Sequence, residues 1–288
     1  MEKISNILSR PLKPFDINDY GGLSDDEYLK DEIIYCRKCN TSRMFIHPDG
    51  RKSRSLCDCQ AAERNKSEQY NKELEELKEA LEPLRDFSIL EDERYKDVRF
   101  SNTETDHNAD FKNAFNRCKR YCENSNKVLE GGFGIYMHGT AGTGKSRLTA
   151  CMAHELLSQR KQVLFTSFGK IKSILCSTFG KKGNGELFYI NKLSDIDFLI
   201  IDDLGVERVQ SRGDDLWLQE KIFEIINNRY TKKRSTVYTS NYRLNELISD
   251  RGFSERTVDR IADKETAIIE IQGESYRLKS RGTVELPF

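Results

Sequence analysis

One glycine-rich segment most constrains the fold of this chain of 288 residues. It reads GTAGTGKS from Gly139 to Ser146 and matches the pattern G-x-x-x-x-G-K-[ST]. A short apolar run, 134–138, precedes it and an amphipathic run, 145–159, follows it, which predicts a strand, a tight loop and a helix. The glycines let successive backbone N–H groups face phosphate oxygens, and the N-terminus of the helix adds positive charge there. The segment therefore predicts a phosphate-binding loop in an α/β domain.

Every residue of this loop is a candidate for phosphate binding. The set is Gly139, Thr140, Ala141, Gly142, Thr143, Gly144, Lys145 and Ser146. Lys145 can reach the β- and γ-phosphates of a nucleotide, and the hydroxyl of Ser146 can ligate Mg²⁺. The alternative is a glycine turn that arises by chance, and the correctly placed strand and helix argue against it.

After residue 130 the chain alternates short apolar runs with amphipathic runs. Besides 134–138, the predicted strands are 162–167, 197–202, 235–240 and 266–271. The predicted helices are 145–159, a helix from about residue 169, and 215–230. Such alternation is typical of a parallel sheet with helices on both faces. We therefore expect an α/β fold with a parallel five-stranded sheet.

Polar residues follow two of these strands. After the third strand, we expect Asp202 to hold Mg²⁺, directly or through water, and Asp203 to polarise an attacking water. After the fourth, the amide of Asn241 can hydrogen-bond the γ-phosphate or that water, because ligands of such sheets bind at the carboxyl ends of strands. The alternatives are that Asp203 caps a turn or helix and that Asn241 starts a turn.

Four of the eight cysteines lie close together, in the pattern Cys36-x₂-Cys39-x₁₇-Cys57-x-Cys59. Four thiolates in two close pairs suit a structural Zn²⁺ site, and a site without an open ligand position argues against a catalytic metal. The second pair is tighter than C-x₂-C, so His47 stays open as a replacement ligand. Four free thiols, or an iron–sulfur cluster in place of zinc, stay open as well.

The prolines divide the chain, because four of the five lie before residue 84 and the last is Pro287. We therefore expect an N-terminal domain over 1–85 and a second domain over 86–288. Residues 61–85 predict a charged helix with an apolar stripe, formed by Tyr70, Leu74, Leu77, Leu81 and Leu84. The stripe either packs on the helix's own domain, which we favour, or docks a partner.

Charge is balanced at 47 basic and 47 acidic side chains, so the chain lacks the basic excess of a dedicated duplex-binding protein. The apolar runs are too short for a transmembrane helix and the start of the chain lacks a secretory signal, which predicts a cytoplasmic protein without a membrane partner. Local basic clusters occur at Arg229, Lys232, Lys233 and Arg234, at Lys181 and Lys182, and at Arg208 and Arg212. A solvated charged face is the simpler interpretation of each cluster.

Together these motifs resemble the DnaC/DnaI-type helicase loaders among the AAA+ ATPases, and the related IstB-type transposition helpers. The resemblance spans about residues 94–280. The motifs that carry it are YKDVRF (95–100), GTAGTGKS (139–146), IDDLG (201–205), YTSN (238–241), RTVDRI (256–261) and SYR (275–277).

This resemblance implies an ATPase that loads a replicative DnaB-type helicase onto single-stranded DNA, with slow ATP hydrolysis as a switch. Asp203 stands where many AAA+ proteins have glutamate, which fits slow turnover. In the family, segment 256–261 supplies an arginine finger to a neighbour's ATP, which implies an ATP-dependent oligomer. We assign the finger to Arg260 with Arg256 in support; the alternative is that both form surface ion pairs. Arg277 is implied as a late sensor of nucleotide.

The cysteine-rich region fits DnaI-like loaders, whose N-terminal zinc-binding domain contacts the helicase, better than it fits IstB-type helpers. The resemblance thus implies that residues 1–85 bind the helicase and that an assembled ring or spiral binds single-stranded DNA, with 204–212 as the preferred contact. We expect no C-terminal lid domain, because only 17 residues follow Ile271. Two further functions stay open: a transposition helper that binds duplex DNA, and a nucleotide-gated adaptor that does not hydrolyse ATP.

Overall fold

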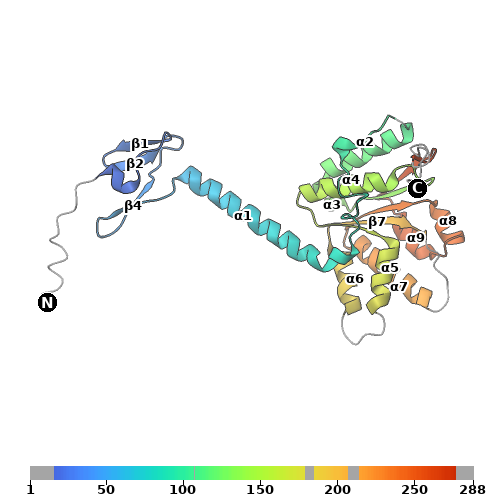
Figure 1. Ribbon diagram of the computed structural model, residues 1–288. Helices are drawn as coiled ribbons and strands as arrows, with labels where there is room; N and C mark the ends of the chain where they lie inside the picture. The colour runs from blue at the N-terminus through green and yellow to red at the C-terminus, as the bar shows by residue number, and fades with distance from the viewer. Residues whose placement is uncertain (1–15, 107, 179–184, 207–213, 277–288) are drawn as a thin grey trace, which may run out of the picture. The chain divides into compact units, whose positions relative to one another are not determined.

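The computed structural model describes residues 16–106, 108–178, 185–206 and 214–276 (Figure 1). The chain forms two compact units, residues 1–75 and 76–288. No helix within these described ranges combines the length and the apolar character that crossing a bilayer requires.

The first unit consists of two short hairpins and the start of a long helix. Its elements are η1 (Ile17–Tyr20), β1 (Glu27–Lys30), β2 (Ile33–Cys36), β3 (Met44–Ile46), β4 (Lys52–Arg54) and α1 (Asp58–Leu81). β1 pairs with β2 and β3 with β4, both antiparallel. The buried apolar side chains of these elements and their connections are few: Ile34, Cys36, Met44 and Cys57. A core this small supplies little burial energy, so other contacts must hold the unit together.

A buried carboxylate provides one such contact. Glu27 in β1 is 2% exposed, and it accepts hydrogen bonds from Arg43, at 2.8 Å, and from Arg54. Burial raises the pKa of Glu27, but hydrogen bonds from Arg54, from a backbone N–H and from Arg43 outweigh it and lower the pKa to about 2. Glu27 is therefore charged at neutral pH and links β1 to β4 and to the segment before β3.

The second unit is an α/β domain built on a five-stranded parallel sheet. Its strands are β5 (Gly134–Gly139), β6 (Val163–Ser167), β7 (Phe198–Leu204), β8 (Ser235–Ser240) and β9 (Thr266–Ile271). They lie in the order β6-β7-β8-β5-β9, and every neighbouring pair is parallel. The predicted fold class and the five predicted strands are confirmed.

Helices cover both faces of this sheet, as predicted. They are α2 (Ala109–Glu123), α3 (Ser125–Gly131), α4 (Lys145–Ser158), α5 (Phe168–Thr178), α6 (Gly185–Asp195), α7 (Asp214–Thr231), α8 (Leu244–Ser249) and α9 (Glu255–Ile261), with 3-10 turns η2 (Glu82–Phe87) and η3 (Phe100–Asn102). Figure 1 shows α2 to α4 on one face and α5 to α9 on the other.

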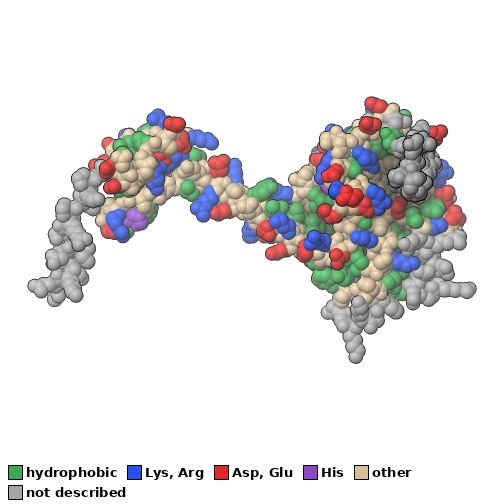
Figure 2. Space-filling model, in the orientation of Figure 1, with side chains coloured by type: hydrophobic (Ala, Val, Ile, Leu, Met, Phe, Trp, Pro, Cys, Tyr) green, Lys and Arg blue, Asp and Glu red, His purple; other side chains and the backbone are tan. Residues whose placement is uncertain are grey.

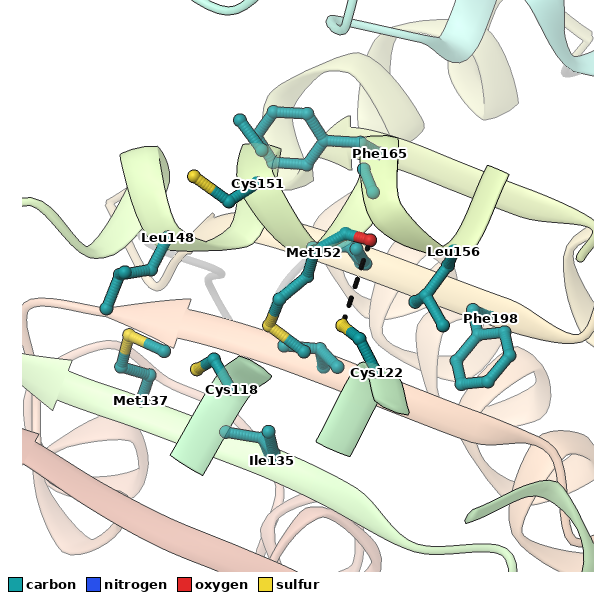
Figure 3. Packing of buried hydrophobic residues seen from close by; sticks show 14 of the residues in the cluster. Cys118, Cys122, Ile135, Met137, Leu148, Cys151, Met152, Leu156, Phe165 and Phe198 are labelled. Carbon is teal, nitrogen blue, oxygen red and sulfur yellow. Dashed lines mark hydrogen bonds between the residues drawn. The ribbon is translucent and has the colours of Figure 1, made fainter. Parts of the chain in front are cut away.

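The two faces of the sheet form two separate cores because side chains alternate along each strand. In β7, Phe198 and Ile200 pack with α2 and α4, whereas Leu199 and Ile201 pack with α5, α6 and α7. Figure 3 shows the first of these cores, in which the sulfur atoms of cysteines and methionines from α2, β5 and α4 come together. The nearly unbroken apolar sequence of β7 follows from its burial on both faces.

The apolar stripe predicted over 61–85 is buried only at its end. Leu84 is 1% exposed in the second unit's core, and Leu81 packs against that core. No residue of α1 itself is buried, and Tyr70 is 45% exposed. The last turn of the stripe therefore packs in the second unit and not on the N-terminal domain that we favoured, and the rest of the stripe is not buried.

Arg229 in α7 corrects the predicted basic cluster at 229–234. Its side chain is 1% exposed, and burial lowers its pKa to about 9. Its guanidinium donates to one hydroxyl and four backbone carbonyls: Thr236 Oγ1, Leu193 O, Ile196 O, Asp197 O and Ser235 O. Arg229 therefore joins α7 to the starts of β7 and β8 and is no part of a nucleic-acid surface. On the face that Figure 2 shows, basic and acidic side chains are interspersed.

We expect Arg229→Met to destabilise the second unit by about 3–5 kcal/mol, because it leaves several buried oxygens without a donor. Lys232→Met is the matched control. Lys232 pairs with Asp195 at 2.6 Å on the surface, and losing such a pair costs under about 1 kcal/mol. Chemical denaturation of each variant, followed by circular dichroism, gives the free energy of unfolding of the second unit. Equal free energies of unfolding for the two variants would contradict this role of Arg229.

Candidate nucleotide and metal sites

The glycine-rich loop joins β5 to α4, as predicted. Gly139 and Gly142 have φ angles of 144° and 81°, which favour glycine. Space excludes a side chain as well, because a Cβ atom would lie 1.9 Å from Ile271 O at Gly139 and 2.1 Å from Ser275 Oγ at Gly142. The segment after β9 is therefore packed directly against the loop, and the backbone N–H of Tyr276 donates to Gly142 O at 2.9 Å.

Lys145 lies at the start of α4 and is 5% exposed. Its ammonium donates to Gly139 O at 2.9 Å, to Thr140 O at 2.8 Å and to Asn241 Oδ1 at 2.9 Å. Asn241 follows the last residue of β8. The structure therefore brings together two predicted site residues that stand far apart in the sequence.

The acid pair lies at the end of β7, where the pairing of β7 with β8 shifts register between Ile201 and Leu204. Asp202 is 2% exposed, whereas Asp203 is exposed and has a φ of 56°, in the left-handed region. Thr239 of β8 holds both: its hydroxyl donates to Asp202 Oδ1 at 2.5 Å and accepts from the backbone N–H of Asp203 at 3.0 Å. The irregular strand end thus turns the two carboxylates to different surroundings.

Burial, and then the negative charge of Asp203, raises the pKa of Asp202 to about 6. Hydrogen bonds from Thr239 and Ser146 act in the opposite direction. The carboxylate of Asp202 and the hydroxyl of Ser146 are hard oxygen donors, and their proximity fits a Mg²⁺ ion bound together with phosphate.

A cavity of about 470 Å³ opens over the loop. Of the predicted residues, Lys145, Ser146, Asp203 and Asn241 line it, together with Ala141, Gly142 and Gly144. Arg94, Tyr95, Arg147, Val206 and Tyr276 also line it, and our predicted set did not include them. A second cavity of about 300 Å³ shares Gly144, Arg147 and Tyr276 with the first and is also lined by Phe111.

Thr239 is the main polar group that sequence reasoning overlooked as a site residue. Its signal was present, because the motif YTSN puts hydroxyl groups at the end of an otherwise buried strand. Its role becomes visible only when β7 and β8 are seen as neighbours.

The two predicted finger arginines lie on α9, and neither lines the cavity over the loop. Arg260 is held within its own chain: it donates to Asn227 Oδ1 at 3.2 Å and to Asp259 Oδ2 at 2.9 Å, and it lies over the ring of Tyr230. Arg256 is exposed and lies over the ring of Phe223. The predicted sensor Arg277 and most of the predicted DNA contact 204–212 fall outside the described residues.

The four predicted cysteines come together in the first unit. Cys36 ends β2, Cys39 follows it closely, and Cys57 and Cys59 lie at the start of α1. Their four Sγ atoms all lie within 4.8 Å of one another, with Cys36–Cys59 at 3.6 Å and Cys57–Cys59 at 3.3 Å. Four sulfurs around a tetrahedral Zn²⁺ lie about 3.8 Å apart, so the donor set fits this metal.

The polar groups around the cysteines also favour the thiolate form of their side chains. Arg43, which is buried and paired with Glu27, approaches Cys36 Sγ at 3.5 Å, and Thr41 Oγ1 lies 3.0 Å from Cys39 Sγ. His47 does not belong to the cluster, because its Nε2 lies 3.0 Å from Ser53 Oγ. The tight second pair of cysteines therefore needs no replacement ligand.

Comparisons with known proteins bear on the fold and the family of this chain. The replicative helicase loader DnaC of Escherichia coli strain K12 is 29% identical over 171 residues, which cover 59% of this chain and 65% of the loader. The chain thus matches just under two thirds of that relative's length. A crystal structure of the DnaC helicase loader, at 24% identity, has a TM-score of 0.51 and is matched over 99% of its length by 62% of this chain. A crystal structure of DnaI, at 20% identity, has a TM-score of 0.50 and is matched over 92% of its length by 63% of this chain.

These structural likenesses show a fold shared with the DnaC and DnaI structures. A family profile described as IstB-like ATP binding protein matches residues 66–283, which include the glycine-rich loop, the acid pair and α9. Because this match covers most of the chain, the protein belongs to the family of IstB-like ATP binding proteins.

Proposed function

We propose that this protein is an ATP-dependent loader that places a replicative DnaB-type helicase on single-stranded DNA. The observation that carries the proposal is the convergence of Lys145, Asn241 and Asp203 on one cavity, with the buried Asp202 next to Asp203, in a fold shared with helicase loaders. In this proposal residues 1–85 are the partner-binding domain and 86–288 the ATPase domain. The protein then works in the cytoplasm, where the replication machinery of a bacterium or phage operates.

ATP binds along the two adjoining cavities. The backbone N–H groups of 142–146 and the ammonium of Lys145 hold the phosphates, because the loop curves at Gly142 and Gly144, where φ is positive. The nucleoside enters the smaller cavity, where the exposed ring of Tyr276 offers a surface for a base. Arg147 lines both cavities and so stands where they adjoin.

Hydrolysis proceeds at the end of β7. Asp203 orients a water molecule for attack on the γ-phosphorus. The oxygen of this water forms a bond to the phosphorus while the bond between the phosphorus and the bridging oxygen of ADP breaks. ADP leaves with the electron pair, and the proton of the water passes to the Asp203 carboxylate and on to solvent. Ser146 and Asp202 would hold Mg²⁺, which would neutralise charge on the phosphates. The short side chain of Asp203 fits slow turnover, which suits a switch.

Self-association completes the site. We assign the finger to Arg260 with Arg256 in support, reaching the γ-phosphate on a neighbouring subunit. Arg260 must first leave Asn227 and Asp259, so its present contacts describe a resting state. Nucleotide-dependent assembly then sets whether the loader holds or releases its partners, and the assembled inner face holds single-stranded DNA.

The cysteine cluster supports the partner-binding domain. Cys36, Cys39, Cys57 and Cys59 bind one structural Zn²⁺, which supplies the cohesion that the small core lacks. Exposed apolar side chains of the same unit, Leu29, Phe45 and Ile46, are then free to meet a protein surface.

A transposition helper ATPase is the second candidate, because the motifs also resemble IstB-type helpers and the matching family profile is described as IstB-like. A nucleotide-gated adaptor without turnover is a third. The acid pair, and Asn241 beside Lys145, argue against an adaptor without ATP hydrolysis, because hydrolysis needs these groups.

The deciding experiment mixes the full chain with the replicative helicase of the same organism and with circular single-stranded DNA. We expect ATP to yield a loader–helicase complex and helicase that stays on the circle after gel filtration. Duplex DNA of equal length is the control substrate. Binding to duplex DNA without any capture of helicase would contradict the loader and favour the transposition helper.

A further inference from the structure

The acid pair is followed by a tight turn with an unusual backbone. Asp203 has a φ of 56° and Gly205 a φ of 84°, both left-handed, and the N–H of Val206 donates to Asp203 O at 3.2 Å. Left-handed backbone at a residue other than glycine costs about 1 kcal/mol or more and persists only where the surroundings hold it. The position of the Asp203 carboxylate therefore depends on what fixes this turn.

One side of the turn is fixed from within the sheet. Thr239 accepts from the N–H of Asp203, and the hydroxyl of Ser240 donates to Leu204 O at 2.7 Å. Both come from β8, so the inner side of the turn is tied to the neighbouring strand.

The other side is fixed by one arginine from a distant segment. Arg251 lies between α8 and α9, and its Nε donates to Gly205 O and its Nη2 to Val206 O. Its guanidinium also lies over the ring of Tyr242, 4.7 Å from the ring centre. A Cβ atom at Gly205 would lie 2.6 Å from Leu247 Cδ2, so the turn is packed closely against α8. Arg251 thus clamps two successive carbonyls directly after the acid pair.

We infer that Arg251 is a positioning residue for hydrolysis: it holds the 203–206 turn so that Asp203 presents its carboxylate to the cavity that Val206 also lines. This inference rests on the proposed role of Asp203. A fork of two N–H groups on two carbonyls fixes both the distance and the plane of the turn, which one hydrogen bond does not do.

The test uses the full chain and four variants: Arg251→Met, Arg251→Lys, Asp203→Asn and the double variant R251M/D203N. We expect Arg251→Met to lower kcat for ATP about 10- to 100-fold, because a small misplacement of a catalytic group has effects of that size. The dissociation constant of ATP should stay within about twofold, since the guanidinium of Arg251 contacts the turn and Tyr242 rather than the glycine-rich loop. Arg251→Lys, which can reach one carbonyl, should recover part of the rate.

The double variant separates positioning from general damage to the fold. If Arg251 acts through Asp203, R251M/D203N is no slower than D203N, whereas independent effects would multiply. Arg117→Met is the control, since Arg117 also donates to a backbone carbonyl, Ile268 O, away from the cavity. Thermal melting of each variant shows that it is folded.

The outcomes separate the role of Arg251 from that of Asp203. In one outcome Asp203→Asn is slow, but Arg251→Met and Arg251→Lys both hydrolyse ATP at the wild-type rate. This outcome overturns the inference and leaves the proposed function standing. An Asp203→Asn variant that hydrolyses ATP like the wild type overturns the role of Asp203 and the inference with it. Multiplicative losses in the double variant also overturn the inference.

Discussion

Lys145→Ala should abolish ATP binding while leaving the fold intact. The ammonium of Lys145 is the one buried cation that the described part of the cavity over the loop contains, and its present partners are backbone carbonyls and Asn241. Phosphate oxygens would replace some of these contacts, so removing the ammonium costs the complex a charge-assisted interaction. We expect the affinity for ATP to fall at least about 100-fold, which corresponds to about 2.7 kcal/mol.

The control for Lys145→Ala is a substitution of a lysine that lies away from the phosphate-binding loop. Lys161→Ala serves, because Lys161 donates to Asn126 Oδ1 at 2.6 Å on the opposite end of α4 from the loop. Fluorescent ATP binding at fixed Mg²⁺, with a melting curve for each variant, gives the result. A folded Lys145→Ala protein that binds ATP as tightly as the wild type would show that the site is assigned wrongly.

Removal of the metal should unfold the first unit and spare the second. Cys57 is 1% exposed and its sulfur lies beside that of Cys59, which also contacts Cys36, so Cys57→Ser removes a buried ligand from the cluster. We expect about one Zn²⁺ per wild-type chain, little in the variant, and rapid proteolysis of 16–57 in the variant, because the free energy of zinc binding in such small units is folding free energy.

Cys176→Ser is the matched control, since Cys176 is an exposed thiol of α5 in the other unit. It should leave the zinc content, measured by elemental analysis, and the proteolysis pattern unchanged. ATP binding should survive in both variants, because the nucleotide cavity lies wholly in the second unit. Wild-type protein purified without chelators that contains no zinc would refute the metal site.

Sequence reasoning predicted the sheet well because each strand carries a local signal. Four of the five strands are largely buried, the edge strand β9 is apolar at alternate positions, and most of the helices between them have a period of 3.6; this pattern depends on neighbours along the chain. The glycine-rich loop was predictable for a similar reason: the glycines, Lys145 and Ser146 act from consecutive positions. The convergence of Lys145 with Asn241 followed from a rule on parallel sheets, that strand ends meet at one edge.

Sequence reasoning missed single polar residues whose contacts are with segments far away in the sequence. Arg229 looked like one of four basic surface residues, yet Leu193 and Ile196, in α6 and just after it, supply it with buried carbonyls. Thr239 and Arg251 each fix the acid pair from another element. Nothing in the local pattern of one arginine or threonine distinguishes a buried clamp from a solvated side chain, so only the packed fold identifies them.

The central claim is that ATP with Mg²⁺ binds where the loop after β5 meets the acid pair of β7. Isothermal titration calorimetry of the full wild-type chain with ATP, in buffer with and without Mg²⁺, tests this most directly. The account predicts saturable binding of about one ATP per chain that tightens when Mg²⁺ is present, and weaker binding for Asp202→Asn. No measurable affinity for any adenine nucleotide in the presence of Mg²⁺ would contradict it.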